Sequence, residues 1–478
     1  MSETTSPARL ATRESVPRRL LSLAEAVTPF AAVTGQPCAA VSFGPSGCEI
    51  WPIRGARFRQ WLLAAYVARY GEAPSHQALR TAIETLEALA LYTPDPARPV
   101  ALRIASLGDA FHPSTLLLDL ANAAGQTLSI DEAGFSVLPQ PSPLFRRADS
   151  TIALPTPVEN SGPSGLERLL PLPAEDLTRI HLWLTAALRP TGPYPILVLT
   201  GPSGAGKSLA ASLLRSILDP SLDPVRQLPS RRNALLDLAW QNRILAFDGI
   251  ARLSPSLSAA LCTLSSGASI NIPNSASPRE PLAATIARPL ILVLPPSAAA
   301  KLDPHLASRA LLVRLPELSP ARRRTEAALR AAFAELHPAI LGTICRAAST
   351  ALRDVASVQL AQLPRLADFA VWSAAAAPAF GLTPSDAVAA AAPPPTPSLA
   401  SAVHDLLTGL AAPWHGRATE LLHNLRTYCP PHLLPATPRA LSEALTTLPT
   451  IHLLRHRTEG ERTLTLTLAA AKTATNLP

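Results

Sequence analysis

Residues 195–208, with the sequence PILVLTGPSGAGKS, constrain the fold more than any other stretch of the chain. Residues 196–200 are a short apolar run typical of a buried strand, and residues 201–208 fit the pattern G-x-x-x-x-G-K-[ST]. Leucine and alanine then recur at helical spacing over residues 209–218. A strand, a glycine-rich loop and a helix in this order are the context that a phosphate-binding loop requires. The stretch therefore predicts an α/β core with a nucleotide-binding loop.

The residue types of this loop suit phosphate binding. Its glycines allow a tight turn and a close approach of backbone N–H groups to phosphates, and the N-terminus of the following helix adds a partial positive charge. Lys207 would reach the β- and γ-phosphates of ATP, and the hydroxyl of Ser208 would be a ligand of Mg²⁺. We therefore expect ATP and Mg²⁺ as cofactors, bound by Gly201, Pro202, Ser203, Gly204, Ala205, Gly206, Lys207 and Ser208.

The use of lysine strengthens this prediction. Of the 42 basic residues only three are lysines, namely Lys207, Lys301 and Lys472. The chain otherwise uses arginine, but it has lysine where a compact ammonium on a flexible stem is needed. With 21 glycines in the chain, a chance match to the pattern has a probability of roughly 10⁻³. A glycine turn before an ordinary helix is the alternative, and this low probability disfavours it.

Two further residues are candidates for catalysis. Residues 243–249, RILAFDG, describe a buried strand, and the carboxylate of Asp248 at its end would hold the Mg²⁺ through water. A strand followed by an ordinary Asp-Gly turn is the alternative. Arg309 lies between a short helix and a strand within residues 303–315, where it could point at the γ-phosphate of a neighbouring subunit. Its alternative is an arginine that pairs on the surface.

Proline-rich and polar breaks divide the chain into segments. We expect a flexible N-terminus (1–35), an α+β accessory domain (36–149), a linker (150–168), an ATPase core (169–318), a helical lid (319–390), a second linker (391–398) and a winged-helix-like domain (399–470).

The accessory segment has short strands and amphipathic helices. We expect strands within 38–53 and helices over 57–70 and 75–91, the second capped by Ser75. Weakly alternating residues between 99 and 138 suggest a small sheet. Two tryptophans and two arginines of this segment could stack on nucleic acid, namely Trp51, Trp61, Arg57 and Arg59. The alternative is that the aromatic residues pack in a core, which is their more common role.

Local signals also place elements in the core and lid. Ser230 is the expected cap of a helix over 231–240, and residues 266–288 read as a polar stretch. Ser319-Pro320 is the expected start of two helices, over 320–336 and 338–353.

The last segment combines helices with a hairpin. Apolar residues recur at helical spacing from Leu399, further helices follow residues 414–416 and Thr437, and residues 451–468 alternate as a hairpin. Helices followed by a hairpin match a winged-helix module. Arg455, Arg457 and Arg462 would then contact DNA phosphates. A protein-interaction surface is the alternative.

Composition sets broad limits on the protein's class. The net charge is +8 and the pI is near 9.7, which permits contact with nucleic acid, although arginine-rich composition can also reflect genomic base bias. The five scattered cysteines include no C-x-x-C, which argues against a disulfide framework and a zinc site. The N-terminal residues contain no apolar signal core and no stretch of the chain predicts a membrane span. We therefore expect a soluble cytoplasmic protein.

From residue 150 onward the order of parts resembles the P-loop ATPases of prophages and integrated mobile elements, which are related to superfamily 3 helicases and the ATPase part of primase-helicases. The motifs that carry the resemblance are TGPSGAGKS (200–208), ILAFDG (244–249), LSPSLSAALCTLSSG (253–267), ARPLIL (287–292), LDPHLASRALLVRLP (302–316) and LPRLADFAVWSAAAAPAFG (363–381). The resemblance implies an AAA+-like P-loop ATPase core with an N-terminal α+β accessory domain, a helical lid and a C-terminal winged-helix module.

The chain departs from the pattern of that family at three positions. The family commonly has a polar residue after the strand-ending acid, where this chain has Gly249. It also has a polar residue, usually Asn, at the position of Val293, and an acid beside the finger arginine, where this chain has Ser308. These changes would impair the positioning of the attacking water, which contributes several kcal/mol in phosphoryl transfer.

The resemblance implies an ATP-dependent DNA helicase or translocase that takes part in the replication of a mobile element. Its expected partners are DNA, further copies of the chain in a ring, and a primase or another replication protein, but no membrane. An ATP-binding scaffold or regulator with weak or lost hydrolysis is the alternative, which Gly249 and Val293 suggest. A P-loop kinase for a small molecule is a third, less favoured interpretation.

Overall fold

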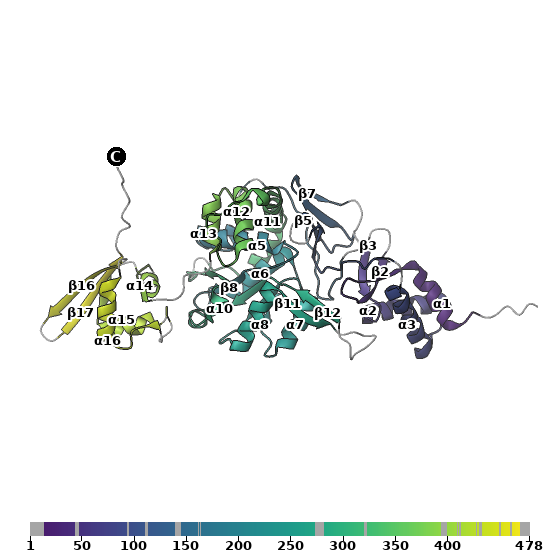
Figure 1. The fold of residues 1–478 in the computed structure, drawn as a ribbon, viewed down its shortest axis with the longest axis horizontal. Coiled ribbons are helices and arrows are strands. Elements are labelled where there is room, and N and C mark those ends of the chain that lie inside the picture. Colours follow the sequence, from purple (N-terminus) through teal and green to yellow (C-terminus); the bar gives the residue numbers. More distant parts are fainter. Residues whose placement is uncertain are drawn as a thin grey trace, which may run out of the picture. The chain divides into compact units, whose positions relative to one another are not determined.

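The computed structural model describes residues 14–43, 47–92, 95–109, 113–138, 145–160, 162, 164–272, 282–319, 323–392, 399–408, 410, 413–426, 428–429, 433–448, 451–458 and 461–468. The chain forms two compact units. The first comprises Met1–Ile130, Phe135–Thr156 and Ser269–Ile286, and the second Asp131–Gly134, Pro157–Ala268 and Ala287–Pro478. Figure 1 labels their helices and strands.

The first unit begins with helices against a three-stranded antiparallel sheet of order β1-β2-β3. Helix α2 buries Phe58, Leu62 and Tyr66, which recur every four residues and so share one face. Ser75 caps α3 as expected, since its Oγ accepts a hydrogen bond from the N–H of Ala78 at 3.2 Å. The elements are α1 (Val16–Leu23), η1 (Ala24–Ala26), β1 (Thr28–Ala31), β2 (Pro37–Phe43), β3 (Gly47–Pro52), α2 (Ala56–Tyr70) and α3 (His76–Tyr92).

The structured start of this unit corrects one expectation. Residues 14–35 are not a flexible lead-in, because α1 and β1 occupy most of them and bury Leu20 and Phe30 completely or nearly so. Trp51 is also buried, and the Arg57 guanidinium lies over its ring, 4.9 Å from the centroid. Trp51 therefore packs in the core, which is the commoner role that the sequence left open.

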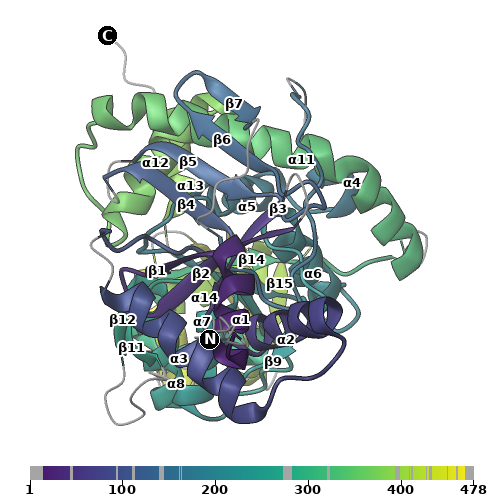
Figure 2. The same ribbon diagram turned by 90° about the vertical axis from the view of Figure 1, so that its right-hand side faces the viewer.

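A second antiparallel sheet of the order β4-β5-β6-β7 follows, with strands β4 (Ile104–Gly108), β5 (Pro113–Asp119), β6 (Thr127–Asp131) and β7 (Gly134–Val137) (Figure 2). The expected polar stretch 266–288 also contains a paired strand, because β11 (Ala268–Ile272) pairs with β12 (Leu282–Ile286). The residues between these two strands lie outside the described part.

The second unit is organised on a five-stranded sheet of the order β14-β8-β13-β10-β9. All pairs in this sheet are parallel, and the strands β8 and β13 are buried along their full length, as their apolar runs predict. The strands are β8 (Ile196–Thr200), β9 (Arg226–Gln227), β10 (Leu245–Asp248), β13 (Leu290–Val293) and β14 (Ala310–Arg314).

Helices lie on both sides of this sheet. In Figures 1 and 2, α11 to α13 lie at the top of the second unit and α7 and α8 at the bottom. The helix expected over 231–240 forms, but its N-cap residue is Arg231 and not Ser230, and the N-cap makes no side-chain capping hydrogen bond. The helices up to β14 are α4 (Leu166–Leu169), α5 (Ala174–Ala187), α6 (Lys207–Leu218), α7 (Arg232–Gln241), α8 (Pro255–Ser266), α9 (Pro296–Ala299) and α10 (Pro304–Ala307).

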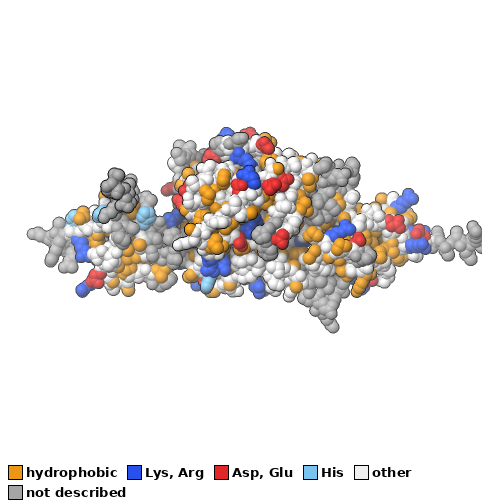
Figure 3. Space-filling view, turned by 45° about the horizontal axis from the view of Figure 1, so that its top comes forward, with side chains coloured by type: hydrophobic (Ala, Val, Ile, Leu, Met, Phe, Trp, Pro, Cys, Tyr) orange, Lys and Arg blue, Asp and Glu red, His pale blue; other side chains and the backbone are white. Residues whose placement is uncertain are grey.

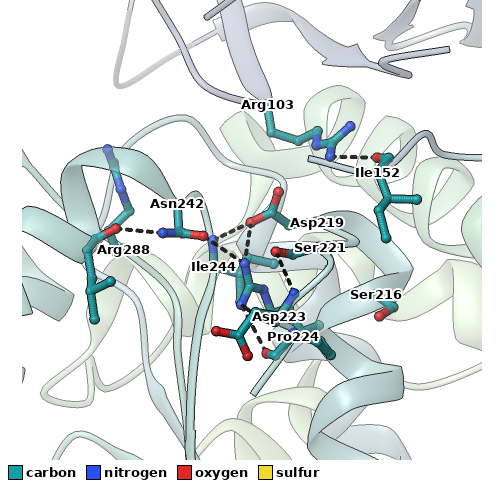
Figure 4. Close-up of polar contacts among 12 residues, drawn as sticks. Arg103, Ile152, Ser216, Asp219, Ser221, Asp223, Pro224, Asn242, Ile244 and Arg288 are labelled. Atoms are coloured by element: carbon teal, nitrogen blue, oxygen red, sulfur yellow. Dashed lines mark hydrogen bonds and ion pairs between the residues drawn. The ribbon is translucent and has the colours of Figure 1, made fainter. Parts of the chain in front are cut away.

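A buried polar network fixes helix α6 against strand β10. Arg215 donates to the carbonyls of Asp223 and Pro224 at 3.1 and 3.0 Å and to Asn242 Oδ1 at 2.9 Å. Asp219 Oδ2 accepts from the N–H of Ile244 at 3.0 Å (Figure 4). Because Arg215, Asp219 and Asn242 are buried, the loss of a partner would leave a costly unsatisfied charge or dipole. The network holds the end of α6 at the start of β10.

The helices after β14 differ from the expected pair. A single helix, α11 (Glu326–Asp354), replaces the two expected over 320–336 and 338–353. Thr325 caps it, accepting from the N–H of Ala328 at 3.2 Å, and Pro338 lies inside it. Helices α12 (Ala367–Ala376), η4 (Ala377–Phe380) and α13 (Pro384–Ala391) follow, and α12 packs on both α11 and α13.

Part of the expected linker 150–168 is bound to α11. The N–H of Val158 donates to the carbonyl of Pro338 at 3.0 Å. The chain runs so close to the helix that a Cβ on Gly342 would overlap the carbonyl oxygen of Val158. Gly342 is therefore required for this contact, although glycine is unfavourable inside a helix.

Residues 399–468 have a core of their own, formed by α14 to α16 and a three-stranded sheet of the order β15-β17-β16. The helices and the hairpin match the expectation, and strand β15 was missed. The elements are α14 (Leu399–Thr408), β15 (Trp414–Gly416), α15 (Ala418–Leu425), α16 (Pro438–Ala444), β16 (Ile451–Thr458) and β17 (Glu461–Leu468). Residues 393–398 of the expected second linker lie outside the described part. Among the described residues, no helix is long and apolar enough to cross a membrane.

Replacing Gly342 by Ala should destabilise the protein, whereas a Gly to Ala change in an exposed helix stabilises by about 1 kcal/mol. The added Cβ would overlap backbone atoms of Val158, which cannot turn away as a side chain can, so a loss of about 1–3 kcal/mol is expected. Thermal or urea unfolding of the full chain measures this. The control is Gly162→Ala, since a Cβ there lies 3.4 Å from Asn160 Oδ1 and fits. A more stable Gly342→Ala variant would contradict the contact.

Candidate nucleotide-binding site

The parallel sheet gathers the candidate residues at one edge. The pairings of β13 with β8 and of β10 with β13 are both parallel, so the carboxyl ends of these strands face the same side. The loop 201–206 follows β8, Asp248 ends β10, and Val293 ends β13 between them. Ligands of open α/β sheets bind outside the carboxyl ends of the strands, where the order reverses. The sequence-predicted loop and acid thus lie at the expected edge.

The loop requires glycine at three positions. Gly201, Gly204 and Gly206 have φ of +147°, +78° and +78°, which L side chains rarely adopt. At Gly201 a Cβ would also overlap the carbonyl oxygen of Leu315. Gly206 is the N-cap of α6. Because glycine has no side chain that could cap the helix, the N–H groups of the first turn remain available to a ligand. Ser208, in that turn, is exposed.

Lys207 lies over the loop from which it starts. Its Nζ donates to the carbonyls of Gly201 and Pro202 at 2.9 and 2.7 Å. No described carboxylate forms an ion pair with it. The ammonium therefore keeps its full charge for an anion that reaches the loop.

Asp248 has an uncommitted carboxylate oxygen. Its Oδ1 accepts from the N–H of Gly249 at 2.6 Å, and no other partner occurs in the described part of the chain. The half-buried carboxylate and the exposed hydroxyl of Ser208 are the oxygen ligands that Mg²⁺ prefers. The buried hydroxyl of Thr200, at the base of the loop, is also without a partner among described residues. These unsatisfied groups fit a bound nucleotide with its metal. Sequence reasoning did not identify Thr200.

Two positions at the carboxyl edge of the sheet lack polar side chains: Gly249, directly after β10, and Val293, at the end of β13. Gly249 has φ of +69°, which explains the glycine after the acid. Val293 is only 2% exposed and packs beside Leu199 of β8. An Asn at position 293 would therefore need a polar partner in an apolar layer.

Arg309 lies at the other edge of the sheet. It precedes β14, and Ala310 pairs with Ile196, the first residue of β8, while the loop follows the last. Its Nη1 donates to the carbonyl of His305 at 2.9 Å. The buried thiol of Cys262 is near it, and burial raises the pKa of that thiol while the charge of Arg309 lowers it. Arg309 is thus not brought together with the loop of its own chain.

An apolar cavity adjoins the loop. Its lining comes from the chain before α5, from α6 and from the chain after β14: Leu169, Leu170, Pro171, Leu172, Ala205, Gly206, Leu209, Ala210, Leu213, Leu315, Pro316, Leu318 and Leu329. Its volume is about 50 Å³, far below the roughly 300–1,000 Å³ of small-molecule sites, so it cannot enclose a nucleobase.

The basic residues of the hairpin lie apart from this site in the sequence. The exposed Arg455 donates to the carbonyl of Ser442 in α16 at 2.8 Å. Arg457 is directly opposite Arg462 in the strand register, although both side chains lie outside the described part. On the face shown in Figure 3, Lys and Arg side chains are scattered, so net charge alone marks no nucleic-acid surface there.

Comparisons with solved structures gave distant similarities. The apo C-terminal region of NrS-1 matches at 10% identity over 95% of this chain and 100% of that chain, with a TM-score of 0.39. The JCV helicase matches at 13% identity over 46% of this chain and 64% of that chain, with a TM-score of 0.26. TM-scores this low do not establish a shared fold. Among curated proteins no match was found.

The comparison with protein families gave a match that covers the site. Residues 170–393, which contain the loop, Asp248, Arg309 and the helices α11 to α13, match the family described as actinomycete integrative conjugative element replication protein. This part of the chain is therefore similar to replication proteins of mobile elements, as its motifs indicated, and that resemblance is confirmed.

Proposed function

We propose that this chain is an ATP-dependent helicase or translocase that acts on DNA during replication of a mobile element. One observation carries the proposal: the glycine loop, Lys207 and Asp248 lie at one edge of the parallel sheet. Lys207 forms no ion pair with a described carboxylate, and one carboxylate oxygen of Asp248 has no partner among the described residues. In this proposal, the second unit contains an AAA+-like P-loop ATPase core over residues 169–318. Helices α11 to α13 are its lid, and residues 399–470 are a winged-helix module.

The loop residues would hold the phosphates of ATP. The N–H groups of the loop and of the first turn of α6 would donate to the phosphate oxygens, and Lys207 would exchange its carbonyl partners for the β- and γ-phosphates. Ser208 and Asp248 would hold Mg²⁺, which neutralises charge on the phosphates when bound.

Arg309 would act between subunits. Because it lies at the edge away from its own loop, it can reach a γ-phosphate only in a neighbouring copy. This role requires a ring or another homo-oligomer, in which each site is completed by the next subunit.

A nucleotide-binding scaffold with weak hydrolysis is a second candidate function. Gly249 directly follows β10 and the buried Val293 ends β13, so neither position offers a polar side chain to orient water. Loss of water positioning would cost several kcal/mol of barrier but leave ATP binding intact. The two candidates share the same binding site.

Lys207→Ala should reduce ATP affinity by at least about 100-fold, because the loss of a charge-assisted contact costs about 3 kcal/mol. Titration of the full chain with a fluorescent ATP analogue measures this. Arg232→Ala, which removes an exposed charge at the start of α7, serves as the control and should bind normally. Thermal unfolding should be unchanged in both variants. Equal affinity of Lys207→Ala and wild type would reject the site.

Reversal of Arg455, Arg457 and Arg462 to Glu should weaken DNA binding by the full chain. Each lost phosphate contact lowers the slope of log K against log salt by nearly one unit, so the slope should fall by about 2–3. Fluorescence anisotropy at several salt concentrations measures it. The matched control reverses Arg231, Arg232 and Arg330, which are exposed elsewhere in the second unit. If the control weakens binding equally, the hairpin is not the DNA contact.

A further inference from the structure

A second cavity lies at the carboxyl edge of the same sheet. Its volume is about 530 Å³, within the range of small-molecule sites. It is lined by the chain after β10, the first turns of α8, the end of β13 and residues around α9. None of its lining residues belongs to the loop 201–208 or to the apolar cavity beside that loop.

Two cations line this cavity without an anionic partner. Arg252 and Lys301 are both exposed, and neither forms an ion pair or side-chain hydrogen bond with a described residue. Asp303 also lines the cavity, but its carboxylate caps α10 by accepting from the N–H of His305 at 2.8 Å. Lys301 is one of the three lysines of a chain that otherwise uses arginine. The cavity therefore presents a net positive surface.

A serine hydroxyl and the start of a helix add to this surface. Ser258, in the first turns of α8, is only 3% exposed, yet its side chain lines the cavity. Its hydroxyl has no partner among the described residues. The Oγ atom itself keeps contact with the solvent of the cavity, so it is available to donate a hydrogen bond to a ligand there. The N-terminus of α8, which begins at Pro255, favours an anion at the same place.

The wall also contains Ser297 and apolar side chains such as Leu253 and Leu302. An inorganic anion would leave these unused, whereas a nucleotide combines a phosphate with an apolar sugar and base face. We propose that this cavity binds the phosphate group of a nucleotide, either free or as a unit of a DNA strand. The choice of a nucleotide rests on the proposed function, but the residues that bind it are separate from the ATP loop.

Lysine acetylation of the full chain tests this, because each lysine reports one location. Acetic anhydride labels exposed amines, and mass spectrometry gives the labelling of Lys207 and Lys301 separately. The probes are thymidine monophosphate, a short oligothymidylate, inorganic phosphate and ATP. We expect either thymidine probe to slow acetylation of Lys301 by about fivefold or more when saturating. If the oligothymidylate protects Lys301 at a lower nucleotide concentration than thymidine monophosphate does, the ligand is a DNA strand. If the two probes protect equally, the ligand is the free nucleotide.

Variants separate the cavity from unspecific binding. Arg252→Ser should weaken the protection of Lys301 by about tenfold in probe concentration, as expected for one charge-assisted contact, and Ser258→Ala should weaken it less. In the control variant Arg232→Ser, the probes should protect Lys301 as well as they do in the wild type. No protection by either thymidine probe, protection by inorganic phosphate alone, or equal protection in Arg252→Ser would overturn the proposal. Failure of ATP to protect Lys207 would instead count against the proposed function.

Discussion

The parallel pairing of β8, β13 and β10 is the constraint on which the rest of the structure depends. Parallel strands begin and end at the same edges, so this pairing alone brings the glycine loop and Asp248 together from distant parts of the chain. The same rule sends Arg309 to the far edge, because it precedes its strand and does not follow it. We propose that one subunit holds the phosphates and that Arg309 of the next subunit completes the site, and this division of roles follows from that geometry.

The packing around the sheet keeps this edge in place. The buried Arg215 and Asp219 tie the end of α6 to the start of β10, so the helix that begins at Lys207 and the strand that ends at Asp248 cannot shift independently. Close backbone approaches act in the same way. Gly201 lets the loop pass the carbonyl of Leu315, and Gly342 lets residue 158 contact α11. Replacing either glycine by alanine would disrupt its contact, because even a Cβ atom does not fit there.

Local sequence signals predicted the elements of the site but not their arrangement. The glycine pattern and the apolar runs are local, and the loop and Asp248 lie where they were expected. The strand order depends on pairing between distant segments, so the edge on which Arg309 lies could not be read from its neighbours. Helix α11 continues through Pro338, since buried packing along it outweighs one missing N–H donor. Lys301 was conspicuous in the composition, but only the fold shows the cavity that it lines.

ATP turnover by the full chain, with and without single-stranded DNA, tests the central claim most directly. The account of a DNA-dependent motor predicts turnover of about 1 s⁻¹ or faster with DNA, and its loss in a variant without the Lys207 ammonium. Turnover that stays at the level of that variant, in a protein that still binds ATP and DNA, would contradict the motor. The scaffold function that Gly249 and Val293 suggest would then be the better account.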